Sequence, residues 1–211
     1  MRASGKSDRT KAQMMRAAIR VFTRLGYEGA TVRDIAGEAG VNIGLIRYHF
    51  GHKADIYRDT LAYVSEQYNE VCLGALHAAA PSGDPEEIIY AWLAAPIIGW
   101  QDATVATGEE VLRFLNRMGY EDPELTREVY ESHFSYAERE WQDTLRAFFP
   151  RMTRGDWLWC LTALRGMYFN VVAHDEFTLW GLPAVQAREA AVRRLAGDAV
   201  TLLRAYAGGA E

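Results

Sequence analysis

Thr31 to Lys53, TVRDIAGEAGVNIGLIRYHFGHK, is the stretch that most restricts how this chain can fold. The Thr31 hydroxyl is placed to accept a hydrogen bond from the Asp34 amide while the Asp34 carboxylate reaches back, so T-x-x-D predicts a capped helix start. Gly40 follows at the position where a left-handed residue ends a helix, and Asn42 is suited to cap the next one. The first helix has one small apolar face: Val32, Ile35, Ala36 and Ala39. The sequence therefore predicts two short helices joined by a glycine turn.

Two short helices with this connection fit the helix-turn-helix, in which the second helix enters the major groove of DNA. At ~100° per residue, one face of that helix, within ~140°, presents Ile43, Gly44, Arg47 and Tyr48. Leu45 and Ile46 then face the protein. Arg47 is able to pair with O6 and N7 of guanine or to clamp a phosphate, and both roles stay open. Ile43 suits a thymine methyl group, and Gly44 permits close approach.

The segments LGYEGATVRDIAGEAGV and RYHFGHK closely resemble the DNA-binding domain of tetracycline-repressor-type (TetR-type) transcriptional regulators. The matching signatures follow in order at the right spacing over about a quarter of the chain: Gly26, Tyr27, the T-x-x-D-I-A run, the A-G-V turn, Phe50 and Lys53. The resemblance implies a DNA-binding domain at residues 1–52 and an effector-binding and dimerisation domain at 53–211. It also implies that the DNA backbone is bound by Tyr48, His49 and Lys53.

The complete set of expected DNA contacts is Thr31, Arg33, Asn42, Ile43, Gly44, Arg47, Tyr48, His49 and Lys53. Thr31 and Arg33 begin a helix whose amide dipole favours a phosphate, although capping is the first role of Thr31. Tyr48 has the alternative of packing in the core. His49 and His52 have a spacing seen in metal sites, but no third ligand is near, and we expect no metal.

Charge is distributed unevenly along this acidic chain, whose net charge is −5. Residues 1–60 hold 11 Lys and Arg against 6 Asp and Glu, whereas residues 61–211 hold 12 against 22. Phosphate contacts supply most non-specific affinity for DNA. The basic N-terminal end therefore agrees with DNA docking there, with an ordinary solvated face as the alternative.

The sequence gives little support to other classes of protein. No apolar run is long enough for a membrane span, and MRASGKSDRTKAQ lacks the apolar segment of a secretory signal, so we expect a cytoplasmic protein. Cys72 and Cys160 sit in apolar helical patterns without metal or redox spacing. We find neither a phosphate-binding glycine loop nor a catalytic constellation, and expect no cofactor and no enzymatic activity.

Apolar residues recur at helical spacing along the chain and no segment alternates as a strand does, which predicts an all-α fold of about nine helices. Asp84-Pro85 and Asp122-Pro123 predict helix starts, the second opening a helix that runs to about residue 149. Pro96 is expected to kink or end its helix. The segments 155–177 and 184–207 are broadly apolar, which predicts a homodimer interface in which Leu195 and Leu202 take part.

The six tryptophans all lie beyond residue 90, where a regulator of this family would bind its effector. Candidate residues for lining an effector cavity are Trp92, Trp100, Phe114, Trp141 and Phe169, with simple core packing as the alternative. Candidate anchors for an anionic head group are His133, Arg113 and Arg165, with surface ion pairs as their alternative. A weaker resemblance to the fatty-acid-responsive branch of the family implies an apolar effector such as an acyl chain or acyl-CoA.

These observations predict a homodimeric regulator, a repressor that binds a palindromic double-stranded DNA operator and leaves it when a small, mainly apolar effector binds. The first rival is an architectural DNA-binding protein without a ligand. The second is a helical small-molecule-binding or enzymatic domain with an incidental helix-turn-helix.

Overall fold

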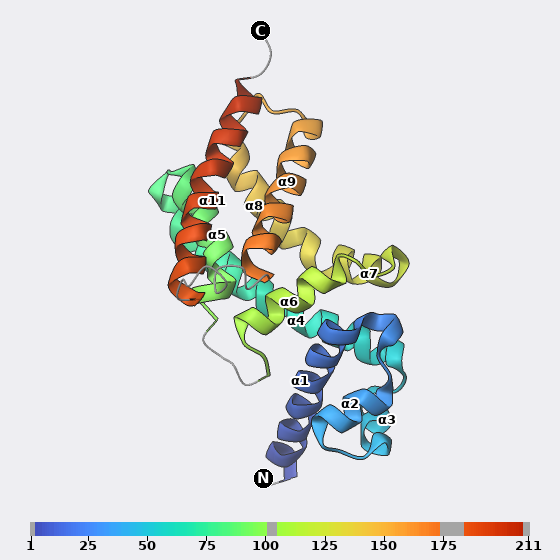
Figure 1. Cartoon of the computed structure of the whole chain (residues 1–211). Helices are drawn as coiled ribbons and strands as arrows, with labels where there is room; N and C mark the ends of the chain where they lie inside the picture. The colour runs from blue at the N-terminus through green and yellow to red at the C-terminus, as the bar shows by residue number, and fades with distance from the viewer. Residues whose placement is uncertain (1–2, 101–104, 174–183, 209–211) are drawn as a thin grey trace. The chain divides into compact units, whose positions relative to one another are not determined.

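Every regular element in the described part of the computed structural model, residues 3–100, 105–173 and 184–208, is helical (Figure 1). The expected all-α fold is confirmed. The described residues form two compact units, the first made of 3–68 with 105–134 and the second of 69–100 with 135–173 and 184–208. The long helix α4 (Lys53–Ala79) contributes residues to both. The assignment of separate roles to 1–52 and 53–211 stays a prediction.

The first unit is built on α1 (Ala3–Gly29), α2 (Val32–Ala39) and α3 (Ile43–Phe50), which lie together (Figure 1). Its other elements are the first turns of α4, α6 (Gly108–Met118), α7 (Pro123–Val129) and the π-helical turn η2 (Tyr130–Phe134). Both α2 and α6 pack against α1. The largest fully buried side chains here are Met14, Ile19, Phe22, Ile35, Ile46, Ile56, Tyr57, Leu61 and Phe114.

The second unit contains the last turns of α4, the short η1 (Ala80–Ser82), α5 (Pro85–Ile98), α8 (Ser135–Arg146), α9 (Arg154–Ala173) and α11 (Ala184–Ala207). Helix α11 packs against α5 and α9 (Figure 1). Helix α5 is buried almost all round, from Ile88 through Pro96 apart from Ala91. Such a helix lies in the core rather than at a surface.

The predicted helix starts at residues 84–85 and 122–123 are confirmed, because the Asp84 and Asp122 side chains each accept a hydrogen bond from the amide two residues on. The single helix expected from 123 to 149 is wrong: the π turn η2 separates α7 from α8, which ends at Arg146. Neither Gly nor Pro stands at this junction, so the sequence carries no local signal for it.

Helix α5 continues past Pro96 to Ile98 instead of ending there. Proline has no N–H, so the carbonyl of Trp92, four residues earlier, loses its normal helical donor. The Cys72 thiol donates to that carbonyl at 3.8 Å, and the Tyr168 hydroxyl donates to the neighbouring carbonyl of Leu93 at 2.9 Å. Both donors are buried and come from other helices, and the Cys72 thiol takes the place of the donor that the proline removes.

Candidate DNA-binding surface

The start of α2 has the capping box that the sequence predicts. The Asp34 amide donates to the Thr31 hydroxyl at 3.1 Å, and the Thr31 amide donates to the Asp34 carboxylate at 2.9 Å. The Thr31 hydroxyl also donates to that carboxylate, and these bonds hold the pKa of Asp34 below its ordinary value. Because the Thr31 hydroxyl is engaged within the box, a phosphate at this end of α2 would meet free backbone amides first.

The turn between α2 and α3 also has the predicted geometry. Gly40 adopts the left-handed conformation, with φ 62° and ψ 32°, and its N–H bonds back to α2. The Asn42 side chain accepts from the Gly44 amide at 2.7 Å and caps α3. On α3, Ile46 is completely buried whereas Gly44 and Arg47 are exposed, so the helix presents the expected face outward. Ile43 is half-buried.

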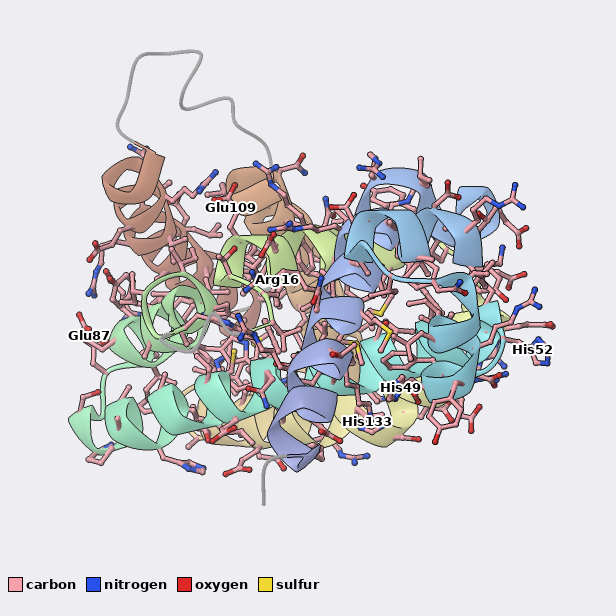
Figure 2. All side chains as sticks on the ribbon, turned by 90° about the horizontal axis from the view of Figure 1, so that it is seen from below. Arg16, His49, His52, Glu87, Glu109 and His133 are labelled. Carbon is pink, nitrogen blue, oxygen red and sulfur yellow. The ribbon has the colours of Figure 1, made fainter. Side chains whose placement is uncertain are left out.

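Tyr48 does not pack in the core, since 83% of its side chain is exposed. Its ring meets the half-buried ring of His49 edge-on, with centroids 5.2 Å apart. His49 on α3 and His52 just after it lie at the end of the helix-turn-helix (Figure 2). No group of three or more metal-ligating side chains occurs among the described residues.

Arg33 and Arg47 are the exposed arginines of α2 and α3, and neither makes an ion pair or hydrogen bond within the described ranges. Lys53 differs from them. Its ammonium group donates to the carbonyl of Tyr27 at 2.8 Å and lies 4.3 Å from the centroid of the Tyr27 ring. It therefore ties the start of α4 to the end of α1. The proposed DNA contact of Lys53 has to coexist with this structural role.

Three arginines at four-residue spacing on α1 have protein partners that the sequence does not reveal. The Arg16 guanidinium, labelled in Figure 2, donates to the carbonyl of Val105 at 2.7 Å. Arg20 pairs with Glu110 of α6 at 2.7 Å and lies 3.9 Å from Glu38 of α2. Arg24 lies 3.7 Å from Glu38. Arg20 and Arg24 connect α6 and α2 to α1 through ion pairs, so the positive charge of these two arginines is already partly neutralised.

Glu110 has two tasks at the start of α6. Its carboxylate accepts from the Thr107 amide at 2.9 Å, which closes a second capping box, and it also binds Arg20. Partial burial raises the pKa of Glu110, but the Thr107 amide and Arg20 outweigh it, so the pKa lies below its ordinary value. The cap of α6 and its attachment to α1 therefore depend on one carboxylate.

The end of α6 is also attached to α1. Just beyond the helix, Glu121 accepts from the Tyr27 amide at 3.1 Å and from Arg117 at 3.2 Å. This contact lies where α1 bends at Gly26, whose φ of 71° and ψ of 177° suit glycine alone. A Cβ at Gly26 would come within 2.8 Å of the Glu121 carboxylate and would also collide with Arg117. Glycine is therefore required here for conformation and for space.

The proposed effector residues do not all lie together. Trp92 and Trp141 are buried in the second unit and stack with centroids 5.5 Å apart and an interplanar angle of 22°. Trp100 and Phe169 are half-buried residues of the same unit. Phe114 belongs to the first unit, where it packs 6.1 Å from the ring of Tyr57. These placements leave the Trp92–Trp141 pair as the centre of the candidate effector site.

The possible anchors for an anionic head group have partners of their own. Arg113 pairs with Glu109 at 2.7 Å, and Arg165 pairs with Glu138. His133 is half-buried and has a partner as well. A cavity of about 310 Å³ lies where α8 leads into α9, lined by Arg146, Phe149, Pro150, Met152, Arg154 and Trp157. None of the five proposed effector residues lines it.

Helix α9 carries large apolar side chains on its surface. Leu158 is 70% exposed, Trp159 60% and Met167 40%. Leu195 of α11, in contrast, is buried within its own unit, so it is unsuited to contacting a second chain directly. Within the described ranges, no helix is both long and apolar enough to cross a membrane.

The capped helix-turn-helix, with an outward face that bears Arg47 and Tyr48, defines a DNA-binding domain of the helix-turn-helix class. Residues 14–60 match the family model described as "Bacterial regulatory proteins, tetR family". Residues 14–60 therefore form a DNA-binding domain of the tetR type, as the sequence signatures predicted. TetR-family regulators are non-enzymatic, DNA-binding proteins.

Relatives support the same assignment. The chain is 29% identical over 97 residues to the HTH-type transcriptional regulator BetI of Vibrio parahaemolyticus, covering 46% of this chain and 48% of BetI. It is 37% identical over 65 residues to the dual regulator CecR of Shigella flexneri, covering 31% and 29% of the two chains. The matched regions thus span half or less of the length of these curated relatives.

Solved structures share the fold over most of the chain. The TetR-like regulator LfrR of Mycobacterium smegmatis, in complex with proflavine, has a TM-score of 0.55 at 19% identity and covers 89% of this chain and 94% of its own. PfmR of Thermus thermophilus has a TM-score of 0.53 at 20% identity and covers 94% and 95%. At these identities the likeness establishes the fold alone.

Proposed function

We propose that this protein is a homodimeric transcription regulator of the cytoplasm, acting as a repressor that a small, mainly apolar effector releases from a palindromic operator. The observation that carries the DNA-binding part is the outward face of α3. It combines a helix capped at its start, an uncovered backbone at Gly44, and an exposed Arg47 and Tyr48 with no protein partner for the arginine within the described ranges. Such a face is suited to contact the base edges in the major groove and the phosphates that border it.

Two roles follow for the remaining contacts. Arg47, Gly44 and Ile43 read base edges, while Arg33, Tyr48 and His49 position the domain on phosphates, as do the backbone amides at the start of α2. Thr31 and Asn42 act through the caps that aim these amides, and Lys53 reaches the backbone from the junction of α1 with α4. Phosphate contacts fix register, so specificity is expected to depend on few side chains.

A homodimer is supported by the exposed apolar side chains of α9, because an exposed apolar patch of this kind marks an interaction site. A helix-turn-helix dimer reads two half-sites about 34–36 Å apart on one face of DNA. An effector would shift that spacing by binding the DNA-incompetent arrangement more tightly. The attachment of α6 to α1 offers a route by which movement in α6 reaches the DNA-binding helices.

Selection of bound sequences from a random DNA pool tests the proposal directly. Enrichment of a palindrome with half-sites about one helical turn apart is the expected result. Enrichment without symmetry, or salt-sensitive binding with no sequence preference, favours the ligand-independent architectural protein instead. Repeating the selection with candidate apolar compounds then tests release, which an architectural protein would not show.

A further inference from the structure

The side chain of Trp141 has an unsatisfied hydrogen-bond donor in the interior of the second unit. Only 5% of Trp141 is exposed, and its indole Nε1 has no hydrogen-bond partner among the described residues. Leaving a buried donor unpaired costs on the order of 1–3 kcal/mol. A phenylalanine would fill most of the same space without that cost, so stability alone does not explain a tryptophan at this position.

The surroundings of Trp141 suit a flat apolar molecule. Its ring stacks on that of Trp92, itself 5% exposed, and α5 around Trp92 is buried from Trp92 through Pro96. Aromatic faces at this separation offer a large apolar area. Ligand sites in proteins bind mainly through apolar burial and use a few polar groups to fix orientation. Trp141 Nε1 is such a polar group.

The charges nearby restrict which acceptor can meet this donor. Arg165 of α9 is the proposed cationic anchor in this unit, and it already pairs with Glu138, three residues before Trp141 on α8. The buried Arg188 of α11 in the same unit also has a partner. A buried carboxylate or phosphate without a cation to pair with is strongly disfavoured. A neutral oxygen, such as that of a ketone, ester or amide, needs only the hydrogen bond.

We propose that Trp141 is the orienting residue of the effector site, and that the effector is a neutral, mainly apolar molecule whose hydrogen-bond acceptor binds Trp141 Nε1 while its apolar body lies against the Trp92–Trp141 pair. This inference rests on the proposed function and makes it narrower. It replaces an anionic acyl effector with a neutral, acceptor-bearing one.

The first test needs no ligand. Trp141→Phe and Trp92→Phe remove the same part of an indole ring from the same stacked pair, but only the first removes a donor that is both fully buried and unpaired. Trp141→Phe is therefore expected to unfold at a temperature roughly 2–4 °C or more above that of Trp92→Phe, measured by circular dichroism. If Trp141→Phe is the less stable of the two, the indole N–H is satisfied in the ligand-free protein, by buried water for example, and the proposal fails.

The second test measures binding of three probes by calorimetry: 2-acetylnaphthalene, which has a neutral acceptor, naphthalene, which has none, and 2-naphthoate, which is anionic. The wild-type protein should bind 2-acetylnaphthalene most tightly. Trp141→Phe should weaken that binding about 2- to 12-fold, the range for one hydrogen bond, and leave naphthalene unchanged. Trp92→Phe should weaken all three alike.

Three results would overturn the proposal: no binding of any probe, preference for 2-naphthoate, or equal loss of all three probes in Trp141→Phe. Release of selected DNA by the same probes is measured in parallel. If a probe needs the Trp141 donor for binding but does not release DNA, Trp141 is a ligand-binding residue and the effector-controlled repressor is rejected. If a neutral probe releases DNA equally well from the wild type and from Trp141→Phe, the effector-controlled repressor stands and the orienting role of Trp141 is rejected.

Discussion

The two compact units satisfy their polar groups in different ways. In the first, hydrogen bonds and ion pairs hold the helices in place: the capping boxes of α2 and α6, the Asn42 cap, the Lys53 ammonium on the carbonyl of Tyr27, and the arginines of α1 on α2 and α6. In the second, an indole donor is unpaired in the core and tryptophan and leucine side chains lie on the surface of α9. The second unit therefore has groups that a ligand or a second chain would complete.

A substitution on the exposed surface of α9 should have the largest effect on dimerisation and DNA affinity. If a second copy covers it, Trp159→Glu should separate the dimer and reduce operator affinity by about 10²–10⁴, since the second half-site is no longer held in place. Analytical ultracentrifugation and DNA titration measure the two effects. Tyr136→Glu, on an exposed tyrosine of α8, is the control and should change neither. A dimer that survives Trp159→Glu would leave this face of α9 without a role.

Substitution of Gly26 tests whether the bend in α1 requires glycine. Gly26→Ala forces an unfavourable backbone and pushes Arg117 and Glu121 away, so the free energy of unfolding should fall by on the order of 3 kcal/mol. Gly74→Ala, on an exposed part of α4 with nothing within 4 Å, should raise it by about 0.5–1 kcal/mol. Urea titration followed by circular dichroism measures both. Equal effects would mean that the bend in α1 is not constrained.

Arg47 and Lys53 separate base reading from positioning. Arg47→Ala should lose about 1–3 kcal/mol of discrimination at one base pair per half-site, because a bidentate contact to guanine disappears. Lys53→Ala should weaken all sequences alike and reduce the salt slope by about 1. It should also lower the unfolding temperature, because it removes the bond to the Tyr27 carbonyl. An unchanged base preference in Arg47→Ala would make Arg47 a phosphate clamp.

Glu110 gives the smallest effect, and the most specific. The Arg20–Glu110 pair is partly exposed, so Glu110→Gln should cost less than about 1 kcal/mol of stability. Because the pKa of Glu110 in the folded protein lies below its ordinary value of 4.5, the stabilisation is complete above about pH 4.5 and disappears as the pH falls past the lowered pKa. Denaturant titrations of the wild type and Glu110→Gln should therefore converge in acid. A constant difference between them would show that the carboxylate charge is irrelevant.

The same contrast explains what could be predicted from the sequence. The helix-turn-helix can be predicted from the sequence because its capping and turn residues act on neighbours within a few residues. Such local hydrogen bonds follow from the spacing of Thr31, Asp34, Gly40 and Asn42. The Arg20–Glu110 pair joins residues 90 apart, and nothing in either segment indicates the other. The arginines of α1 recur every four residues, but this spacing does not indicate Glu38 and Glu110 as their partners.

Fewer contacts of the second unit can be predicted from the sequence, for a related reason. Its tryptophans were recognised as candidate pocket residues, yet which of them meet is decided by the packing of α5 against α8. Stacking of Trp92 on Trp141 and the use of the Pro96-freed carbonyl by Cys72 are consequences of tertiary structure. Leu195 was expected in a dimer interface because a broad apolar stripe does not distinguish a side chain buried in its own unit from one buried by a partner.

The sharing of Arg20 between Glu110 and Glu38 affects how solution measurements on this protein should be interpreted. Added salt weakens exposed ion pairs within the protein as well as its attraction to phosphate. Part of the fall in DNA affinity with ionic strength would then come from a looser hold of α6 and α2 on α1. Counting phosphate contacts from the salt slope of the wild type would give too high a number. The slope of Glu110→Gln, which lacks the carboxylate that pairs with Arg20, would give the better count.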